Sequence, residues 1–162
     1  MQKAIYPIVF LFLSCSVLKA QSDEEAAVGE VINRLFMAMN KADSVMLKSV
    51  FAADAGLTSV VKNKEGNTIL SRESIMEFAS IVGKQTTGAL TEEIWNLKIQ
   101  IDGDFAQAWC DYGFYFNNKF SHCGVDAFQL YRSKEGWKIF QLADTRRREG
   151  CIIPEAIQQK HQ

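Results

Sequence analysis

The second half of the chain alternates apolar and polar residues, and this pattern limits the folds that it can adopt. From Trp95 to Ile101 every second residue is apolar and those between are polar, as in a strand that buries one face. Turn-forming sequences follow at residues 102–104 (DGD), 117–118 (NN) and 134–136 (KEG). We therefore predict four antiparallel strands, the last three over residues 105–116, 120–132 and 137–146.

The first half has the spacing of helices instead. The apolar residues predict an amphipathic helix over residues 23–39, opened by a capping box at residues 22–25. A short second helix follows, capped by Asp43 or Ser44, and then a strand over residues 56–62. The sequence SRES at residues 71–74 opens a third helix that Gly83 ends. The predicted fold class is α+β, in the order α-α-β-α-β-β-β-β.

The N-terminal twenty residues have the features of a secretory signal peptide. Lys3 precedes an apolar run from Ile5 to Leu13, which is too short to cross a bilayer, and Ala20 stands before the expected cut. Lipidation at Cys15 is the alternative. We expect an exported protein, periplasmic or secreted, with one domain over residues 21–153 and a frayed tail over residues 154–162.

The charge of the exported chain argues against nucleic acid as a partner. Removing Lys3 and Lys19 leaves 16 of the 18 basic residues against 19 acidic ones, a net charge of about −3. We predict no nucleic-acid partner, and no membrane partner after the signal is cleaved.

The order of elements resembles the nuclear-transport-factor-2-like superfamily, which includes the SnoaL-like proteins and has a cystatin-like cone fold. The matching segments are NKADSVMLKSVFAADAGLTSV, SRESIMEF and EGWKIFQLADTRR. Through FYFNNKFSHCGVDAFQLYRSKEGWKIFQLADTRR the chain is similar to the putative lumazine-binding family, over residues 23–151. The resemblance implies a cone-shaped, curved antiparallel sheet wrapped around the N-terminal helices. It does not imply one activity, because this fold serves isomerases, dehydratases, cyclases and binding proteins.

Strand alternation predicts which side chains share a face. A two-residue turn at residues 117–118 pairs Trp109 with Asp126, and a three-residue turn at residues 134–136 pairs Asp126 with Asp144. The predicted cavity face then carries a polar cluster above an apolar strip: Trp109, Asp111, Tyr115, His122, Asp126, Asp144 and Arg146, with Phe128, Leu130, Phe140 and Leu142. The opposite face, with Cys110, Tyr112, Cys123, Val125, Ala127, Tyr131, Trp137, Ile139 and Ala143, is apolar enough to predict a homodimer interface.

The paired carboxyl groups are the main chemical signal. Asp126 and Asp144 would repel each other across the strands, so one should have a raised pKa unless a cation such as Arg146 lies between them. A structural Asp-Arg-Asp network and a proton-transfer or ligand-anchoring site are both compatible with this pattern. His122 is a candidate acid or base, or a framework residue, and Trp95 is a candidate stacking group.

The three cysteines after the signal peptide suggest a disulfide. His122 and Cys123 are adjacent on a strand and point to opposite faces, which argues against a zinc site or a Cys-His catalytic pair. Cys123 lies opposite Arg147, and Gly150 lets the chain bring Cys151 back. We predict a Cys123–Cys151 bridge with Cys110 as the spare thiol, although an odd count also allows no bridge.

These features favour a small-molecule binder without a cofactor or metal. Its ligand, apolar or aromatic, would contact Trp95, Trp109, Asp111, Tyr115, Phe128, Leu142 and Arg146. The alternative is a cofactor-independent isomerase, dehydratase or cyclase in which His122, Asp126 and Asp144 act as acid and base. A dimeric interaction module with a filled cavity is a third hypothesis.

Overall fold

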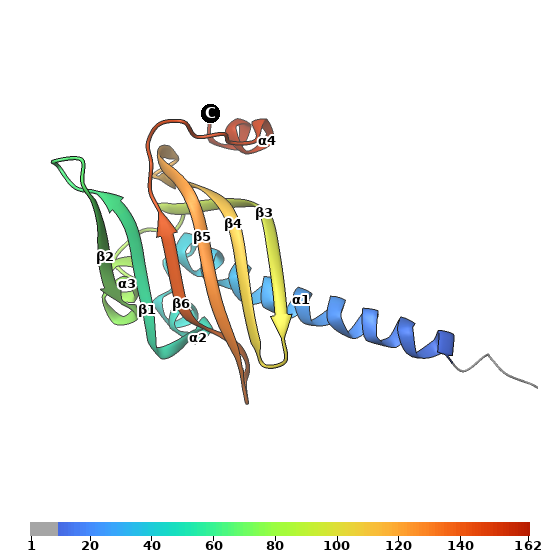
Figure 1. Cartoon of the computed structure of the whole chain (residues 1–162). Helices are drawn as coiled ribbons and strands as arrows, with labels where there is room; N and C mark the ends of the chain where they lie inside the picture. The colour runs from blue at the N-terminus through green and yellow to red at the C-terminus, as the bar shows by residue number, and fades with distance from the viewer. Residues whose placement is uncertain (1–9) are drawn as a thin grey trace, which may run out of the picture.

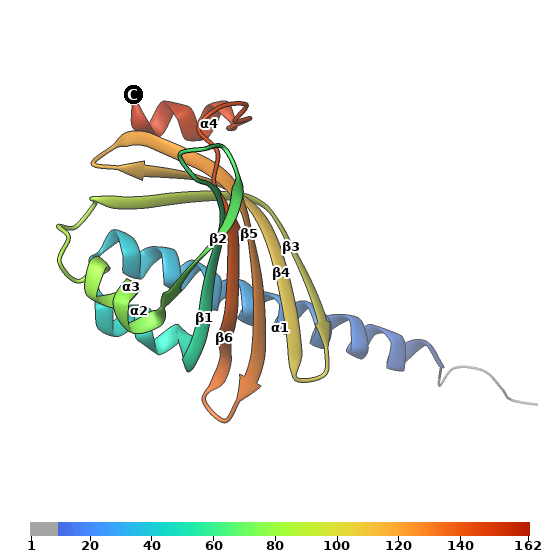
Figure 2. The same cartoon turned by 60° about the vertical axis from the view of Figure 1, so that its left-hand side comes forward.

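The computed structural model describes residues 10–162, with side chains from Gln21 onward. Three N-terminal helices lie on the concave side of one strongly curved sheet, and a short C-terminal helix lies at the far end of the chain (Figures 1 and 2). The elements are α1 (Phe10–Asn40), α2 (Ser44–Val50), β1 (Phe51–Lys62), β2 (Thr68–Ser74), α3 (Ile75–Val82), β3 (Leu90–Asp102), β4 (Phe105–Phe116), β5 (Lys119–Ser133), β6 (Gly136–Thr145), α4 (Glu155–Gln158) and a final 3-10 turn (Gln159–His161).

The α+β cone is confirmed, with a sheet that is mixed instead of wholly antiparallel. The strand order is β2-β1-β6-β5-β4-β3, and the β1–β6 pair is parallel. Strand β2, which pairs antiparallel with β1, is absent from the sequence-based prediction. Its residues carry no strict alternation, because most of them lie on an exposed edge of the sheet.

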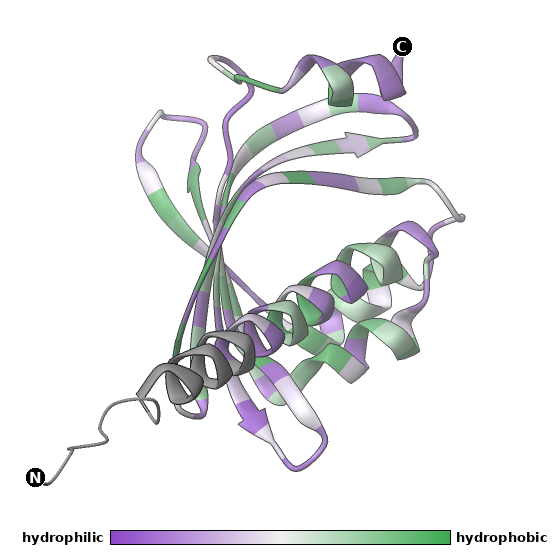
Figure 3. Ribbon diagram, turned by 90° about the vertical axis from the view of Figure 1, so that its right-hand side faces the viewer, coloured by the Kyte–Doolittle hydropathy of each residue, from purple (hydrophilic) through white to green (hydrophobic). Residues whose placement is uncertain are grey.

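The apolar residues whose spacing predicted the helices form the surfaces by which the helices pack on the sheet. Val28, Ile32 and Leu35 of α1 are fully buried against the sheet and α2, and along the strands hydrophobic and hydrophilic residues alternate (Figure 3). Asp43 caps α2 by accepting hydrogen bonds from the amides of Val45 and Met46. Ser74 and Glu77 form a capping box at the start of α3.

Both ends of the chain differ from the prediction. Helix α1 runs without a break through residues 22–25, so the predicted capping box does not begin it. Of the predicted signal peptide, residues 1–9 and the side chains of residues 10–20 lie outside the described part of the chain. No helix in that described part is long and apolar enough to span a bilayer.

The C-terminal tail, which the sequence predicts to fray, forms a short helix and a 3-10 turn. Helix α4 and the turn after it lie against the convex side of the sheet (Figure 2), where the His161 ring stacks on Tyr115 at 3.6 Å between centroids. Lys160 forms a 2.8 Å ion pair with Glu93. These contacts fix residues 155–161 against the sheet, although their sequence has no pattern that predicts this position.

Two irregularities shift the strand register from the predicted one. The Asn117-Asn118 turn forms as expected, with positive φ angles of 50° and 62°, but a β-bulge follows and pairs Phe114 with His122. Cys110 therefore lies opposite Asp126, in the place predicted for Trp109. The turn between β5 and β6 is one residue shorter than predicted, because Ser133 pairs with Gly136. A bulge between the Gln129 and Leu130 pairs shifts the register back, so that Asp126 pairs with Asp144 as predicted.

Candidate ligand-binding cavity

A cavity of about 250 Å³ lies between the helices and the concave face of the sheet. Its walls combine an apolar part from α1, α3 and three strands with a polar part from five strands and the segment after β6. The apolar residues are Leu35, Phe36, Met39, Phe78, Ile81, Leu90, Phe114 and Leu142, and the polar ones are Glu73, Glu92, Tyr112, His122, Asp126, Asp144 and Arg146. A second hollow of about 360 Å³ lies next to it and shares Glu73, Phe78, Leu142, Asp144 and Arg146 with it; Arg72 also lines this second hollow.

Asp126 is the most deeply buried acidic residue of the cavity. Its residue is 3% exposed, and Oδ2 has no hydrogen-bond partner of good geometry. The carboxyl of Glu92 approaches closely enough to interact with it. Burial, followed by the charge of Glu92, raises the pKa of Asp126 well above its usual value. Asp126 therefore ionises less readily than an exposed aspartate.

Glu92 is the second member of this carboxyl pair. Burial raises the pKa of Glu92 to about 7. The interaction with Asp126 opposes this rise, the charge of Asp144 adds to it, and the charge of Arg146 opposes it. The two carboxyl groups can therefore exchange a proton with solvent or a ligand in the physiological pH range.

Asp144 is held in a different way, although it faces the same cavity. Its Oδ2 accepts a 2.7 Å hydrogen bond from Arg146 Nε, and its Oδ1 accepts one from Ser59 Oγ. The Tyr112 hydroxyl donates to the Thr145 carbonyl oxygen at 2.9 Å and lies 3.4 Å from Asp144. Arg146 thus neutralises Asp144 and leaves Asp126 without a cation, unlike the predicted Asp-Arg-Asp network.

His122 lines the cavity as a neutral group. Its ring contacts the edge of Tyr112 and lies 5.1 Å from the ring of Phe114, and Nδ1 is 2.9 Å from Ser121 Oγ. Burial and the positive charge of Arg146 lower the pKa of His122 to about 4. At pH 7 it offers one ring nitrogen as a hydrogen-bond acceptor or donor and carries no charge.

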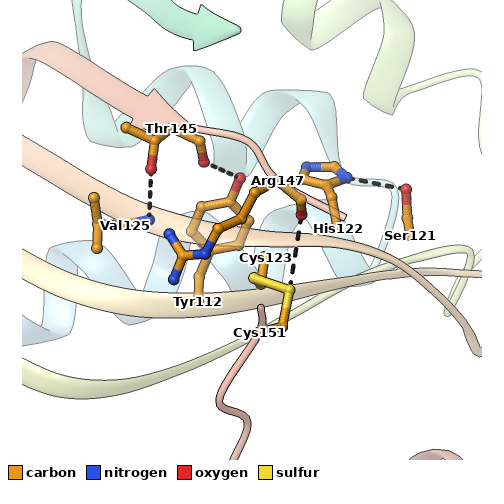
Figure 4. Close-up of a disulfide and its surroundings, with 8 residues drawn as sticks. All are labelled: Tyr112, Ser121, His122, Cys123, Val125, Thr145, Arg147 and Cys151. Atoms are coloured by element: carbon orange, nitrogen blue, oxygen red, sulfur yellow. Dashed lines mark hydrogen bonds between the residues drawn. A yellow bond between two sulfur atoms is a disulfide. The ribbon is translucent and has the colours of Figure 1, made fainter. Parts of the chain in front are cut away.

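The Cys123–Cys151 disulfide forms as predicted and lies on the opposite side of β5 from His122 (Figure 4). Cys123 also exchanges backbone hydrogen bonds with Arg147, as expected from the strand pairing. The bridge engages the sulfur atoms of both Cys123 and Cys151, and Cys110 remains a buried free thiol.

The predicted site residues divide into two groups. His122, Asp126, Asp144, Leu142 and Arg146 line the cavity, and Phe128 packs in the core, edge-on to Phe36 of the cavity wall. Four predicted positions are wrong: Trp95, Trp109, Asp111 and Tyr115 lie on the convex side of the sheet. The Ser121 bulge displaces the β4 residues by one position, which turns them to the other face.

The Ser121 bulge and the shorter turn before β6 together correct the predicted outer face. Cys110, Tyr112, Trp137 and Ile139 face inward, whereas Phe140 packs outside with Phe105 and Tyr131. Ala127 stays on the outside, next to Trp109.

Glu92 is the functional residue that strand alternation missed. A bulge around Asn96, whose φ is 54°, changes the phase of β3. Trp95 therefore points outward, while Glu92 before the bulge and Leu97 and Ile99 after it point inward. Asparagine is one of the few residues that adopts this backbone readily, so Asn96 itself is a signal for the bulge. The alternation of Leu90, Glu92 and Ile94 before it is the second signal.

The sheet curved over three helices, with a cavity at the wide end, defines a protein of the nuclear-transport-factor-2-like superfamily. Solved structures with the same fold include an NTF2-like protein from Shewanella baltica (18% identity, TM-score 0.63, covering 79% of this chain and 97% of that one). Another, from Novosphingobium aromaticivorans, is 15% identical with a TM-score of 0.64 and covers 93% and 98% of the two chains. A putative dehydratase of the NTF2-like family from Streptomyces avermitilis is 16% identical (TM-score 0.59, 80% and 99% covered).

Residues 23–142 match the family model described as putative lumazine-binding. The chain belongs to that family. No curated protein matches the sequence. At these identities the solved structures establish the fold and not the activity.

Proposed function

We propose that this protein is an exported, single-domain binder of a small, partly apolar ligand in the cavity under the helices. The observation that carries the proposal is Asp126 Oδ2, a buried carboxyl oxygen without a hydrogen-bond partner in a largely apolar cavity. An unsatisfied buried polar atom is costly for folding, and a ligand that donates to it would recover that free energy.

The cavity volume limits the ligand. A cavity of about 150 Å³ holds benzene, so about 250 Å³ suits a fused two-ring body with a small polar group, and a four-ring steroid would extend into solvent. A pterin or lumazine, which the family description suggests, has the appropriate size, and Phe36, Phe78 and Phe114 supply aromatic contacts for it.

Ligand binding is tested by a thermal-shift screen of pterins, flavins and steroids at constant pH. We expect the two-ring compounds to raise the melting temperature and Asp126→Asn to abolish that shift. Asp111→Asn is the matched control, because Asp111 lies on the neighbouring strand but on the opposite face of the sheet. Equal shifts in the two variants would exclude the cavity as the site.

A cofactor-independent isomerase or dehydratase is the second candidate. The observation that favours it is the Glu92–Asp126 pair, which can move a proton near pH 7 inside a largely apolar cavity. The discriminating measurement is exchange of a ligand C–H with deuterium in heavy water. Exchange that Asp126→Asn abolishes indicates catalysis, and binding without exchange indicates a binder.

Export is the third part of the proposal. It rests on residues 1–20 and is supported by the Cys123–Cys151 bridge, since such bridges persist in oxidising compartments. N-terminal sequencing of the protein recovered outside the cytoplasm should start at Gln21, whereas a lipidated N-terminal Cys15 would show a lipoprotein.

We also propose a homodimer through the convex face of the sheet. Phe105, Trp109 and Tyr131 are 40%, 51% and 40% exposed there. Phe105 pairs with Tyr131, and Trp109 lies further along β4 opposite Ala127. A second copy would cover the same residues on both chains about a two-fold axis. Sedimentation equilibrium should give twice the monomer mass for the wild type and the monomer mass for Trp109→Lys; a monomeric wild type would reject the dimer.

A further inference from the structure

The charges that line the cavity do not balance. Four carboxyl groups face it, from Glu73, Glu92, Asp126 and Asp144, and Arg146 supplies the only guanidinium or ammonium group among its described lining residues. Arg146 is bound to Asp144. Within the described part of the chain, no salt bridge reaches Glu73, Glu92 or Asp126.

The interior of the cavity is therefore an acceptor site. Asp126 Oδ2 is buried and unpartnered, and Glu92 lies beside it. His122 adds no positive charge at neutral pH, because burial lowers its pKa to about 4, and the Tyr112 hydroxyl is already engaged with Thr145. Further out, Glu77 is bound to Ser74, and Arg72 lines the neighbouring hollow. Arg146 is half-exposed, and Arg148 is exposed and helps to lower the pKa of His122.

An anionic ligand would meet unfavourable charges here. Its negative group would lie among three carboxyl groups, and the one nearby guanidinium already has a carboxylate partner. A cationic ligand would instead be attracted by these carboxyl groups. The rings of Phe36 and Phe114 line the same cavity and can contact its apolar body or form a cation–π contact.

We propose that the cavity selects a small cationic ligand, whose protonated amine or amidine donates hydrogen bonds to Asp126 and Glu92 while its apolar body lies against Phe36, Phe114 and Leu142. This inference rests on the proposed binding function and adds the charge class of the ligand. Binding breaks the O–H bond of the protonated carboxyl, and that proton passes to the buffer as the ligand's positive charge replaces it.

The test uses three probes with one two-ring body: naphthalen-1-ylmethylamine (cationic), naphthalen-1-ylmethanol (neutral) and 1-naphthoate (anionic). We measure their affinities by isothermal titration calorimetry at pH 8 and pH 6, in buffers of high and low ionisation enthalpy. The amine should bind at least about tenfold more tightly than the alcohol, about 1.4 kcal/mol by the usual conversion, and the naphthoate most weakly. Amine binding should release a proton and weaken by up to about tenfold per pH unit on acidification.

Variants separate this inference from the proposed function. Asp126→Asn and Glu92→Gln should each reduce the affinity for the amine about tenfold and leave alcohol binding within about threefold, while Asp111→Asn changes neither. If the alcohol or the naphthoate binds as tightly as the amine, the charge inference is overturned and the binding function stands. If none of the three probes binds, the cavity does not take a two-ring ligand and both proposals fall.

Discussion

Asp126 and Asp144 lie directly opposite each other on β5 and β6, and both carboxyl groups face the same cavity. Asp144 accepts hydrogen bonds from Ser59 and Arg146, whereas one oxygen of Asp126 has no donor. Two identical side chains in paired positions thus have different surroundings. Residues of β1 and of the segment after β6 hold Asp144, and one oxygen of Asp126 has no partner.

Replacing Asp126 with Asn should stabilise the protein increasingly as the pH rises. The folded-state pKa of Asp126 is raised, so below an unfolded-state pKa of about 3.8 both states are protonated and the variant is neutral. At higher pH only the unfolded wild type ionises, which lowers wild-type stability until the folded pKa is passed. We expect a gain of about 1–3 kcal/mol at pH 8 and about zero at pH 3 by urea unfolding.

Asp111→Asn is the control for that measurement. Asp111 accepts a hydrogen bond from Asn96 on the convex side, so the free energy of unfolding should change by less than about 0.5 kcal/mol at any pH. A pH-independent effect of Asp126→Asn would show that the pKa of Asp126 is not raised.

His122→Gln should show the opposite pH dependence. Because the folded-state pKa of His122 is depressed to about 4 from 6.5, the wild type loses stability as the pH falls from 6.5 to 4, and the variant does not. The variant should therefore gain on the wild type by up to about 3 kcal/mol over this window. NMR titration of the His122 ring provides an independent measurement; a midpoint near 6.5 would contradict the buried, neutral state.

The disulfide should be detectable and stabilising. The protein that begins at Gln21 should show one reactive thiol, Cys110, when denatured without reductant and three thiols after reduction. Cys123→Ala with Cys151→Ala should reduce stability by about 3–4 kcal/mol, from the entropy of a loop with a separation of 28 residues. Cys110→Ala is the control that should keep the bridge; three thiols before reduction would disprove it.

Two glycines should respond to alanine in opposite ways. A Cβ at Gly124 would lie 1.8 Å from the Thr145 carbonyl oxygen, a backbone clash that must displace β5 from β6. We expect a loss of about 3 kcal/mol or more for Gly124→Ala. At Gly29 of α1 the nearest atoms are 3.8 Å away, so alanine fits and should stabilise the helix by up to about 1 kcal/mol. Thermal unfolding compares the two variants, and equal effects would argue against this packing of β5 on β6.

The sequence predicted correctly those features of the fold that depend only on residues close together in the chain. The helical spacing of α1, the Asp43 cap of α2 and the Asn-Asn turn each depend on residues close in the chain, and each is confirmed. The Asp126–Asp144 pair and the disulfide were also predicted. Both depend on the pairing of β5 with β6 and the segment after it, and that pairing has the predicted register at Asp126–Asp144 and at Cys123–Arg147.

The cavity was predicted only in part because strand faces depend on register. A single extra residue at Ser121 moved Trp109, Asp111 and Tyr115 to the convex side and brought Tyr112 and Phe114 inward. A bulge at Asn96 did the same for Glu92. Alternation reports the period of a strand and not the position at which its phase changes.

The sequence by itself determined the α+β class, the caps of α2 and α3, the Asn-Asn turn and the presence of His122, Asp126 and Asp144 on one face. Only the tertiary structure decided that Glu92 joins Asp126, that Arg146 joins Asp144, and that one carboxyl oxygen is left without a donor. The physical reason is that helical period and turn propensity are local, whereas burial and charge pairing depend on residues brought together from β2, β3, β5 and the end of β6.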